Sequence, residues 1–211
     1  MKTEQLIGLL AQDDRRLPRI GLRLFPAVLA GVALAGAVGL SLLGVRPDLA
    51  RTLQVPATAM KLLLPLAAGG VGLLGALHLA RPDRHGRDAL AGALAVMAVA
   101  MLWLVLSLLS TPAGQVAAAV MGQTALACLI IVPAMGLPAL AAALYVLRDG
   151  ASVAPARSGA LAGLAAGGLA AATYALHCDE DAPQFFLTWY SLGIAVLVLL
   201  GATVGARILR W

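Results

Sequence analysis

The chain has 211 residues, of which 61% are hydrophobic and 12% are charged, and its formal net charge is +5. A soluble domain has about 45–50% apolar and about 25% charged residues, so this chain has too few polar residues to cover a soluble core. The composition therefore predicts an integral membrane protein. The basic charge needs no direct nucleic-acid partner, because Lys and Arg report orientation in membrane proteins.

The chain begins with a polar segment that lacks the early apolar run of a signal peptide. On a helical wheel, Leu6, Ile7, Leu9 and Leu10 fall within about a 160° arc, and Pro18 would end such a helix. A helix of roughly ten residues is marginal alone in water, so it needs a surface to cover its apolar side. Acidic rather than basic residues accompany this stripe, which favours a protein groove over a lipid surface.

Six apolar segments follow, each close to the length that crosses a bilayer as a helix. We expect them at residues 25–45, 62–80, 89–110, 125–147, 159–177 and 188–206. None has Asp, Glu, Lys or Arg in its interior, which argues against an ion-coupled carrier because intramembrane charges commonly mark ion or proton paths. The predicted fold is an all-α bundle of six transmembrane helices (25–211) with a separate N-terminal tail (1–24).

The positions of Lys and Arg predict the orientation of this bundle. With a cytoplasmic N-terminus, only Arg46, Arg51 and Lys61 of the 15 basic residues lie outside, and the other twelve lie inside. Cytoplasmic loops carry the excess of basic residues in membrane proteins. Both termini are therefore expected in the cytoplasm, and the chain is expected to be a multi-pass protein of the bacterial inner membrane, in contact with membrane lipid.

Small residues recur at helix-packing spacing in the predicted spans. Gly159, Gly163 and Gly167 lie four residues apart on one face of the fifth span, and Gly201 and Gly205 do so in the sixth. Close approach at small residues replaces the hydrophobic drive that lipid does not provide. The pattern fits packing within one bundle, and it leaves a homodimer seam open.

The two cysteines, Cys128 and Cys178, are both expected near the non-cytoplasmic rim, where disulfides form and persist. His177 and Glu180 stand beside Cys178, and thiolates, imidazole and carboxylate suit a borderline metal such as zinc. Three interpretations stay open at this point. The cysteines are a redox-sensing pair, part of a metal site made of Cys128, His177, Cys178 and Glu180, or buried packing residues.

No catalytic motif accompanies these residues. The sequence has no G-x-S-x-G, H-E-x-x-H or phosphate-loop pattern. We expect no enzyme activity and no resident cofactor, with a metal ion as the signal left open. Two alternatives stand beside a regulatory role: a small transporter or channel subunit for an apolar substrate, and a membrane redox protein, although the latter would lack C-x-x-C spacing.

Short motifs spread over the whole chain give a more specific indication. They are M-K-T at 1–3, L-I-x-x-L-A at 6–11, R-R-L at 15–17, G-x-R-P-D-L at 44–49, Y-A-L-H-C-x-E-D-x-P at 174–183, T-W-Y-x-L-G at 188–193 and the terminal L-R-W. With these motifs the chain resembles the NrsF family of bacterial membrane anti-sigma factors, which are negative regulators of extracytoplasmic-function (ECF) sigma factors.

The resemblance implies that the cytoplasmic tail holds an ECF sigma factor at the membrane. The tail residues expected to contact the sigma factor are Leu6, Ile7, Leu9, Leu10, Arg15, Arg16 and Leu17. The resemblance also implies that Cys128 and Cys178 take part in signal perception, which is expected to be a redox or metal stress sensed on the periplasmic side.

Overall fold

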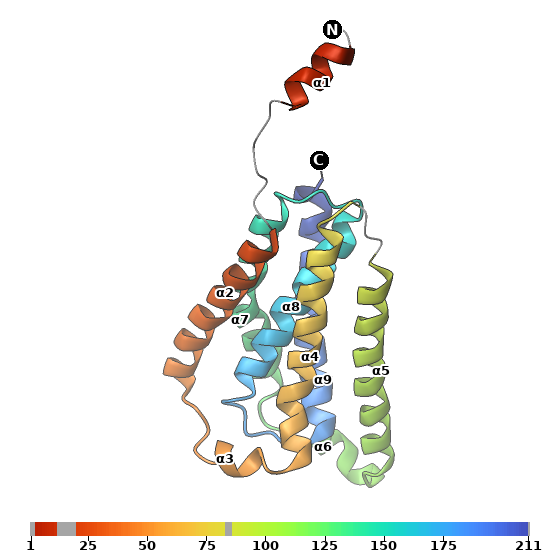
Figure 1. Ribbon diagram of the computed structural model, residues 1–211. Coiled ribbons are helices and arrows are strands. Elements are labelled where there is room, and N and C mark those ends of the chain that lie inside the picture. The colour runs from red at the N-terminus through yellow and green to blue at the C-terminus, as the bar shows by residue number, and fades with distance from the viewer. Residues whose placement is uncertain (1–2, 12–19, 83–85, 211) are drawn as a thin grey trace.

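The computed structural model describes residues 3–11, 20–82 and 86–210, and within these ranges every regular element is a helix. Six long helices lie side by side (Figure 1): α2 (Ile20–Leu43), α4 (Pro56–Leu79), α5 (Arg87–Leu109), α7 (Ala125–Leu147), α8 (Pro155–Tyr174) and α9 (Pro183–Ile208). The shorter elements are α1 (Thr3–Ala11), α3 (Leu49–Thr52), the 3-10 turn η1 (Ala113–Gln115) and α6 (Val116–Met121). The prediction of an all-helical protein is confirmed.

Five helical segments of the described chain are long and apolar enough to cross a membrane: α2, α4, α5, the stretch from η1 through α7, and α9. The sixth long helix, α8, consists largely of Ala and Gly. It packs against α2, α4, α7 and α9, so that most of its length is buried inside the bundle. Its low apolar content follows from this position, since small residues at the centre allow four neighbours to approach.

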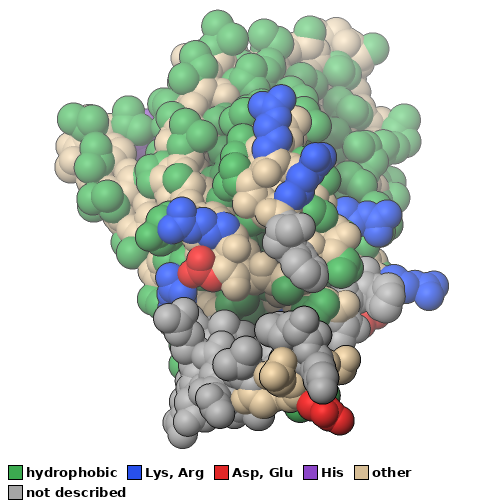
Figure 2. All heavy atoms as spheres, turned by 90° about the horizontal axis from the view of Figure 1, so that it is seen from above, with side chains coloured by type: hydrophobic (Ala, Val, Ile, Leu, Met, Phe, Trp, Pro, Cys, Tyr) green, Lys and Arg blue, Asp and Glu red, His purple; other side chains and the backbone are tan. Residues whose placement is uncertain are grey.

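The bundle has two distinct ends (Figure 1). At one end, here called the tail end, α2 begins and α9 finishes; α3 and α6 lie at the other, here called the thiol end. Figure 2 views the molecule from the tail end and shows Lys and Arg side chains spread over this face with few acids among them. Arg23 in the first turn of α2 pairs there with Asp149, at an N–O distance of 2.7 Å.

Glycines set the contacts of α8. A Cβ atom at Gly159 would collide with the carbonyl oxygen of Gly201, and one at Gly163 with that of Leu197, both on α9. On the opposite side, a Cβ at Gly72 of α4 would lie 2.5 Å from the amide nitrogen of Ala165. The glycine face predicted for the fifth span therefore packs against other helices of the same bundle. This agrees with the first interpretation given above, packing within one bundle.

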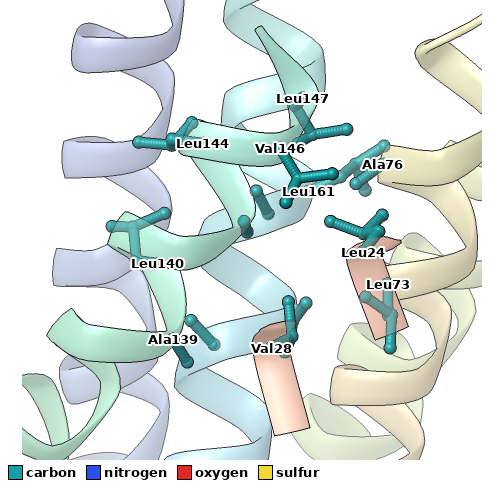
Figure 3. Packing of buried hydrophobic residues seen from close by; sticks show 14 of the residues in the cluster. Leu24, Val28, Leu73, Ala76, Ala139, Leu140, Leu144, Val146, Leu147 and Leu161 are labelled. Atoms are coloured by element: carbon teal, nitrogen blue, oxygen red, sulfur yellow. The ribbon is translucent and has the colours of Figure 1, made fainter. Parts of the chain in front are cut away.

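Interlocking apolar side chains fill the half of the bundle nearer the tail end (Figure 3). The cluster joins α2, α4, α7 and α8, and its labelled members are Leu24, Val28, Leu73, Ala76, Ala139, Leu140, Leu144, Val146, Leu147 and Leu161. A second buried cluster lies around the two cysteines. Because lipid is as apolar as these side chains, close packing rather than exclusion of water holds the helices together.

Candidate functional site

Cys128 and Cys178 lie together at the thiol end. Cys128 is in the first turn of α7, and Cys178 belongs to the segment between α8 and α9, here called the Cys178 loop (residues 175–182). Their exposed fractions are 0% and 3%. The two thiols interact directly with each other but are not bonded. The fold thus brings together two sulfur atoms that are distant in sequence, without exposing either.

Aromatic residues enclose this thiol pair. The Sγ atom of Cys128 donates a hydrogen bond to the hydroxyl oxygen of Tyr174 at 3.7 Å. The rings of Tyr174 and Tyr190 meet edge to face, with centroids 6.0 Å apart. The hydroxyl of Tyr190 is buried near the Cys178 thiol, but it has no well-aligned hydrogen-bond partner among the described residues. An unsatisfied buried hydroxyl is costly, so Tyr190 is a polar group that the packing around the thiols leaves unpaired.

Lys61 is the nearest cation, and it is almost completely buried, with an exposed fraction of 1%. Its Nζ atom donates to the carbonyl oxygen of Cys178 at 2.7 Å, to that of Glu180 at 2.9 Å and to Oδ1 of Asp181 at 3.2 Å. An ammonium group has three donors, so each one has a partner. A buried charge is tolerated only with such pairing, which means that the Cys178 loop is built around this lysine.

Arg46 makes a second set of bonds to the same loop. Its guanidinium donates two hydrogen bonds to Asp181 at 2.7 and 2.9 Å, and two to Asp48 at 2.8 and 3.0 Å. A fifth donor reaches the carbonyl oxygen of Cys178 at 3.2 Å. The backbone also takes part, because the amide of Arg46 donates to the carbonyl oxygen of Leu176 at 3.0 Å. These bonds fasten the chain just after α2 to the Cys178 loop.

The cations change the acidity of the groups they contact. Burial alone would raise the pKa of Asp181, but the hydrogen bonds and charges of Arg46 and Lys61 outweigh it and hold that pKa below its usual value. The interaction with the Cys128 thiol and the positive charge of Lys61 lower the pKa of the Cys178 thiol, against the opposing effect of burial. Since the thiolate is the nucleophile and the metal-binding form, the charge of Lys61 favours the reactive form of Cys178.

The four predicted metal ligands do not form one cluster. His177 contacts the carbonyl oxygen of Gly44 through Nδ1 at 3.0 Å, and Glu180 accepts a hydrogen bond from the amide of Gln123 at 2.6 Å. Within the described part of the chain, no three or more His, Cys, Asp and Glu side chains are arranged to hold a metal ion. Of the predicted set, the structure joins only the cysteines.

The helix that contains the second predicted span begins earlier than expected, and it includes Lys61. The sequence analysis placed this residue in an outer loop, but α4 begins at Pro56, so Lys61 lies in its second turn and points its ammonium into the protein. The signal that could have revealed this is Pro56 itself, because proline is favoured in the first turn of a helix. Neither Lys61 nor Arg46 was predicted as a site residue.

The predicted N-terminal helix is present as α1, Thr3–Ala11. Ile7 is exposed to 60%, as expected for a residue that awaits a partner surface. The side chains of Leu6, Leu9 and Leu10, and all of Arg15, Arg16 and Leu17, lie outside the described residues. The contacts proposed for the tail therefore stay a prediction.

Comparison with known proteins identifies the family. A family model described as "Negative regulator of sigma F" (NrsF) matches residues 10–211. The chain is 34% identical to the anti-sigma-F factor NrsF of Caulobacter vibrioides (strain NA1000 / CB15N) and 33% identical to the probable anti-sigma-F factor NrsF of Azospira oryzae (strain ATCC BAA-33 / DSM 13638 / PS). Both alignments cover the whole of each chain. No solved structure matches. The chain belongs to the NrsF family of anti-sigma factors, which are regulators rather than enzymes.

Proposed function

We propose that this protein is an anti-sigma factor of the bacterial inner membrane that sequesters an ECF sigma factor through residues 1–24. The match of the family model to residues 10–211 carries this proposal. The exposed Ile7 on the short helix α1 agrees with it, because a marginal helix gains stability when a partner covers its apolar stripe. In this view the tail folds fully on contact with the sigma factor. Part of the binding free energy is then spent on ordering the tail, which lowers the affinity.

The proposed topology has six membrane spans and both termini in the cytoplasm. The even number of long helices and the location of α2's start and α9's finish at one end support it (Figure 1). The twelve-to-three division of Lys and Arg also supports it. In this arrangement α8 is the fifth span in chain order, shielded from lipid by its neighbours, and the thiol end faces the periplasm.

The signal that releases the sigma factor is proposed to act on Cys128 and Cys178. A hydroperoxide is the class of oxidant that suits a buried thiol pair with one activated member. The Cys178 thiolate attacks the peroxide, takes up one oxygen as sulfenic acid and releases the alcohol. The Cys128 thiol then attacks that sulfur, and water leaves as the disulfide forms. The interaction of the two thiols supports the second step, and the charge of Lys61 near Cys178 supports its role in the first.

Coupling from the thiols to the tail is proposed to run through α2. Arg46 follows the end of α2 and is bonded to the Cys178 loop, while the start of α2 follows the tail. A disulfide that pulls the loop toward α7 would strain the bonds between Arg46 and Asp181. The equilibrium can shift only by the free-energy difference that the disulfide creates between the two states of the bundle, and α2 is the element that connects both regions.

The test uses full-length protein in lipid nanodiscs and its sigma factor. Wild type should retain the sigma factor, whereas Leu6→Asp and Leu10→Asp should release it, because a charge would enter the buried stripe. Gln12→Asp, off the apolar arc, is the matched control and should retain it. Retention of the sigma factor by both leucine variants would contradict binding through the tail.

A further inference from the structure

A cavity of about 560 Å³ lies between α5 on one side and α8 and α9 on the other, with α4 contributing to its wall. Its volume falls within the range of about 300–1,000 Å³ that is usual for small-molecule sites. Almost all of its lining is apolar, and no acidic side chain takes part in it. We call this cavity the α5 groove.

The α5 groove is closed at the thiol end because α5 and α9 are tied together there. The rings of Trp103 and Phe186 meet edge to face with centroids 5.5 Å apart, and Gln184 donates to the carbonyl oxygen of Ser107 at 3.0 Å. Phe186 and Tyr190 line the groove at this end. At the tail end the lining passes to Gly86, Arg87 and Arg157, where the chain is exposed. The groove is thus a blind apolar channel with a basic entrance.

Among the described residues, the entrance arginines have no acidic partner. Arg87 opens α5, Arg157 lies in the first turn of α8, and both side chains line the groove. Neither one makes an ion pair or a side-chain hydrogen bond within the described ranges 3–11, 20–82 and 86–210. Asp88, the next residue of α5, is not part of the lining. Two cations, with no acidic side chain in the described lining, stand at the entrance of the apolar groove. They complement an anionic head group that carries a long apolar body.

The length of the α5 groove agrees with one leaflet of a bilayer. The lining on α5 extends from Arg87 to Ala100, which is about 20 Å at 1.5 Å per residue. Half of a hydrocarbon core is about 15 Å. From these observations we propose that the α5 groove is a binding site for an anionic phospholipid, whose phosphate is held by Arg87 and Arg157 and whose acyl chain reaches Phe186 and Tyr190. In the proposed topology this lipid comes from the cytoplasmic leaflet.

The site connects lipid to the thiol pair. Phe186 and Tyr190 belong both to the end of the groove and to the buried cluster that contains Cys128 and Cys178. An acyl chain that fills the groove packs against the aromatic rings that enclose the thiols. A bound lipid is therefore expected to keep these rings packed around the two thiols. The inference goes beyond sigma-factor binding and does not depend on it, because lipid affinity is measured on the anti-sigma factor alone.

The experiment is native mass spectrometry of the full-length protein in detergent, titrated with phosphatidylglycerol or with phosphatidylcholine of the same acyl chains. Wild type should retain one phosphatidylglycerol at least tenfold more tightly than phosphatidylcholine. The double variant Arg87→Gln/Arg157→Gln should lose most of this preference. Arg207→Gln removes an arginine from the last turn of α9, outside the groove, and should bind as wild type does. Ala93→Trp, which fills the groove midway, should reduce binding of both lipids.

Melting profiles and size-exclusion elution establish that each variant is folded. The proposal would be overturned by equal affinity for the two lipids, by unchanged selectivity in the double arginine variant, or by the same loss in Arg207→Gln as in the double variant. The last result would show general attraction of anionic lipid to the basic tail end rather than a site in the groove. Binding that Ala93→Trp leaves untouched would likewise place the lipid elsewhere.

Discussion

The Nζ atom of Lys61 lies 2.7 Å from the carbonyl oxygen of Cys178, so a buried cation holds the backbone at this cysteine. The same ammonium binds Asp181, which also accepts two hydrogen bonds from Arg46. Two buried cations therefore share one partly exposed carboxylate. Ionisable residues in membrane helices are rare and tend to be functional, and this lysine has a direct link to the candidate sensor.

We predict that Lys61→Met shifts the reactivity of Cys178 to higher pH. Lys61 lowers the pKa of the Cys178 thiol, so the thiolate is present at lower pH in the wild type. Removal of the charge raises that pKa, and alkylation should then require a higher pH. The measurement is the pH midpoint of iodoacetamide labelling of Cys178, read by peptide mass spectrometry in proteoliposomes.

The midpoint separates this electrostatic effect from loosening of the loop, which would change the labelling rate without moving the midpoint. Lys61→Arg keeps the charge and should keep most of the low midpoint. Arg51→Met removes an exposed basic residue of α3 and should leave the midpoint where it is. A midpoint that is the same in Lys61→Met and wild type would remove Lys61 from the sensing mechanism.

A second prediction compares the two carboxylates that Arg46 binds. Asp181→Asn leaves Lys61 and Arg46 without their shared anion, so it should destabilise the Cys178 loop by about 1–3 kcal/mol, the range for buried groups that lose a partner. Asp48→Asn affects a carboxylate that is more exposed, at 49% of its side chain against 31%, and it should destabilise the loop less than Asp181→Asn does. Hydrogen exchange of residues 175–182 measures the difference.

The ion pairs that Asp181 makes with Lys61 and Arg46 also predict how the stability of the loop depends on pH. Because the pKa of Asp181 lies below its ordinary value, the ionised carboxylate stabilises the folded loop above the unfolded pKa of about 3.9. This contribution is lost as the pH falls through the lower folded value. The hydrogen-exchange rate of the loop, corrected for intrinsic rates, should thus stay constant from pH 5 to 7. It should rise in stronger acid. Equal protection in Asp181→Asn and wild type would show that the ion pairs do not hold the loop.

Much of the fold could be predicted because apolar length and the basic residues are local signals. The span at 125–147 coincides with α7, and the others differ only at their ends. The ends differ because helices continue past the apolar run: α4 starts at Pro56, where the hydropathy of the segment does not mark a boundary. Such an extension is decided by the partner that a residue finds, and no local pattern contains that partner.

The site was harder to predict than the fold. The cysteines could be paired because topology places both at one rim, but Lys61 and Arg46 are recognised only by what they bind. Lys61 contacts Asp181 across more than a hundred residues of sequence, and a single sequence has no information on such a contact. The metal hypothesis grouped His177 and Glu180 with the cysteines because they are neighbours in sequence, yet their side chains are bonded to other segments.

Orientation gives a third prediction. Reporter fusions after Arg84 and Arg157 should show cytoplasmic activity, and fusions after Asp48 and Asp181 should show periplasmic activity, because the basic residues are divided twelve to three. Fusion pairs with alkaline phosphatase and a fluorescent protein provide opposite readouts at each site. A cytoplasmic result at Asp181 would contradict both the topology and the periplasmic position of the thiol pair.

Two neighbouring glycines of α4 give a fourth prediction. Gly72→Ala places a Cβ 2.5 Å from the Ala165 amide nitrogen and 2.7 Å from the Leu161 carbonyl oxygen, so α4 and α8 must separate. Gly70→Ala meets no atom within 4 Å and should be neutral or add up to about 1 kcal/mol through helix propensity. The melting temperature in detergent should thus fall for Gly72→Ala and not for Gly70→Ala. A similar loss in both variants would mean that α8 does not pack as described.

The last prediction concerns whether Cys128 and Cys178 act as one unit. If each needs the other for sensing, Cys128→Ser and Cys178→Ser should both abolish release of the sigma factor by peroxide, and the double variant should be no worse than either single one. The effects of substituting residues in contact are non-additive in this way. If the two thiols acted independently, the double variant would instead show the sum of the two single effects. Sigma-factor release from nanodiscs, measured against peroxide concentration, provides the readout, and Ser keeps the size of each side chain nearly unchanged.

Non-reducing peptide mapping after peroxide treatment follows the covalent product in the same samples. Wild type should yield a disulfide between Cys128 and Cys178. In Cys128→Ser the reaction should stop at a sulfenic acid on Cys178, which dimedone captures, because the resolving thiol is absent. Cys178→Ser should yield little sulfenic acid on Cys128, since the positive charge of Lys61 favours the thiolate of Cys178. Release by peroxide in the double Ser variant would leave both cysteines as packing residues and would require another sensor in the protein.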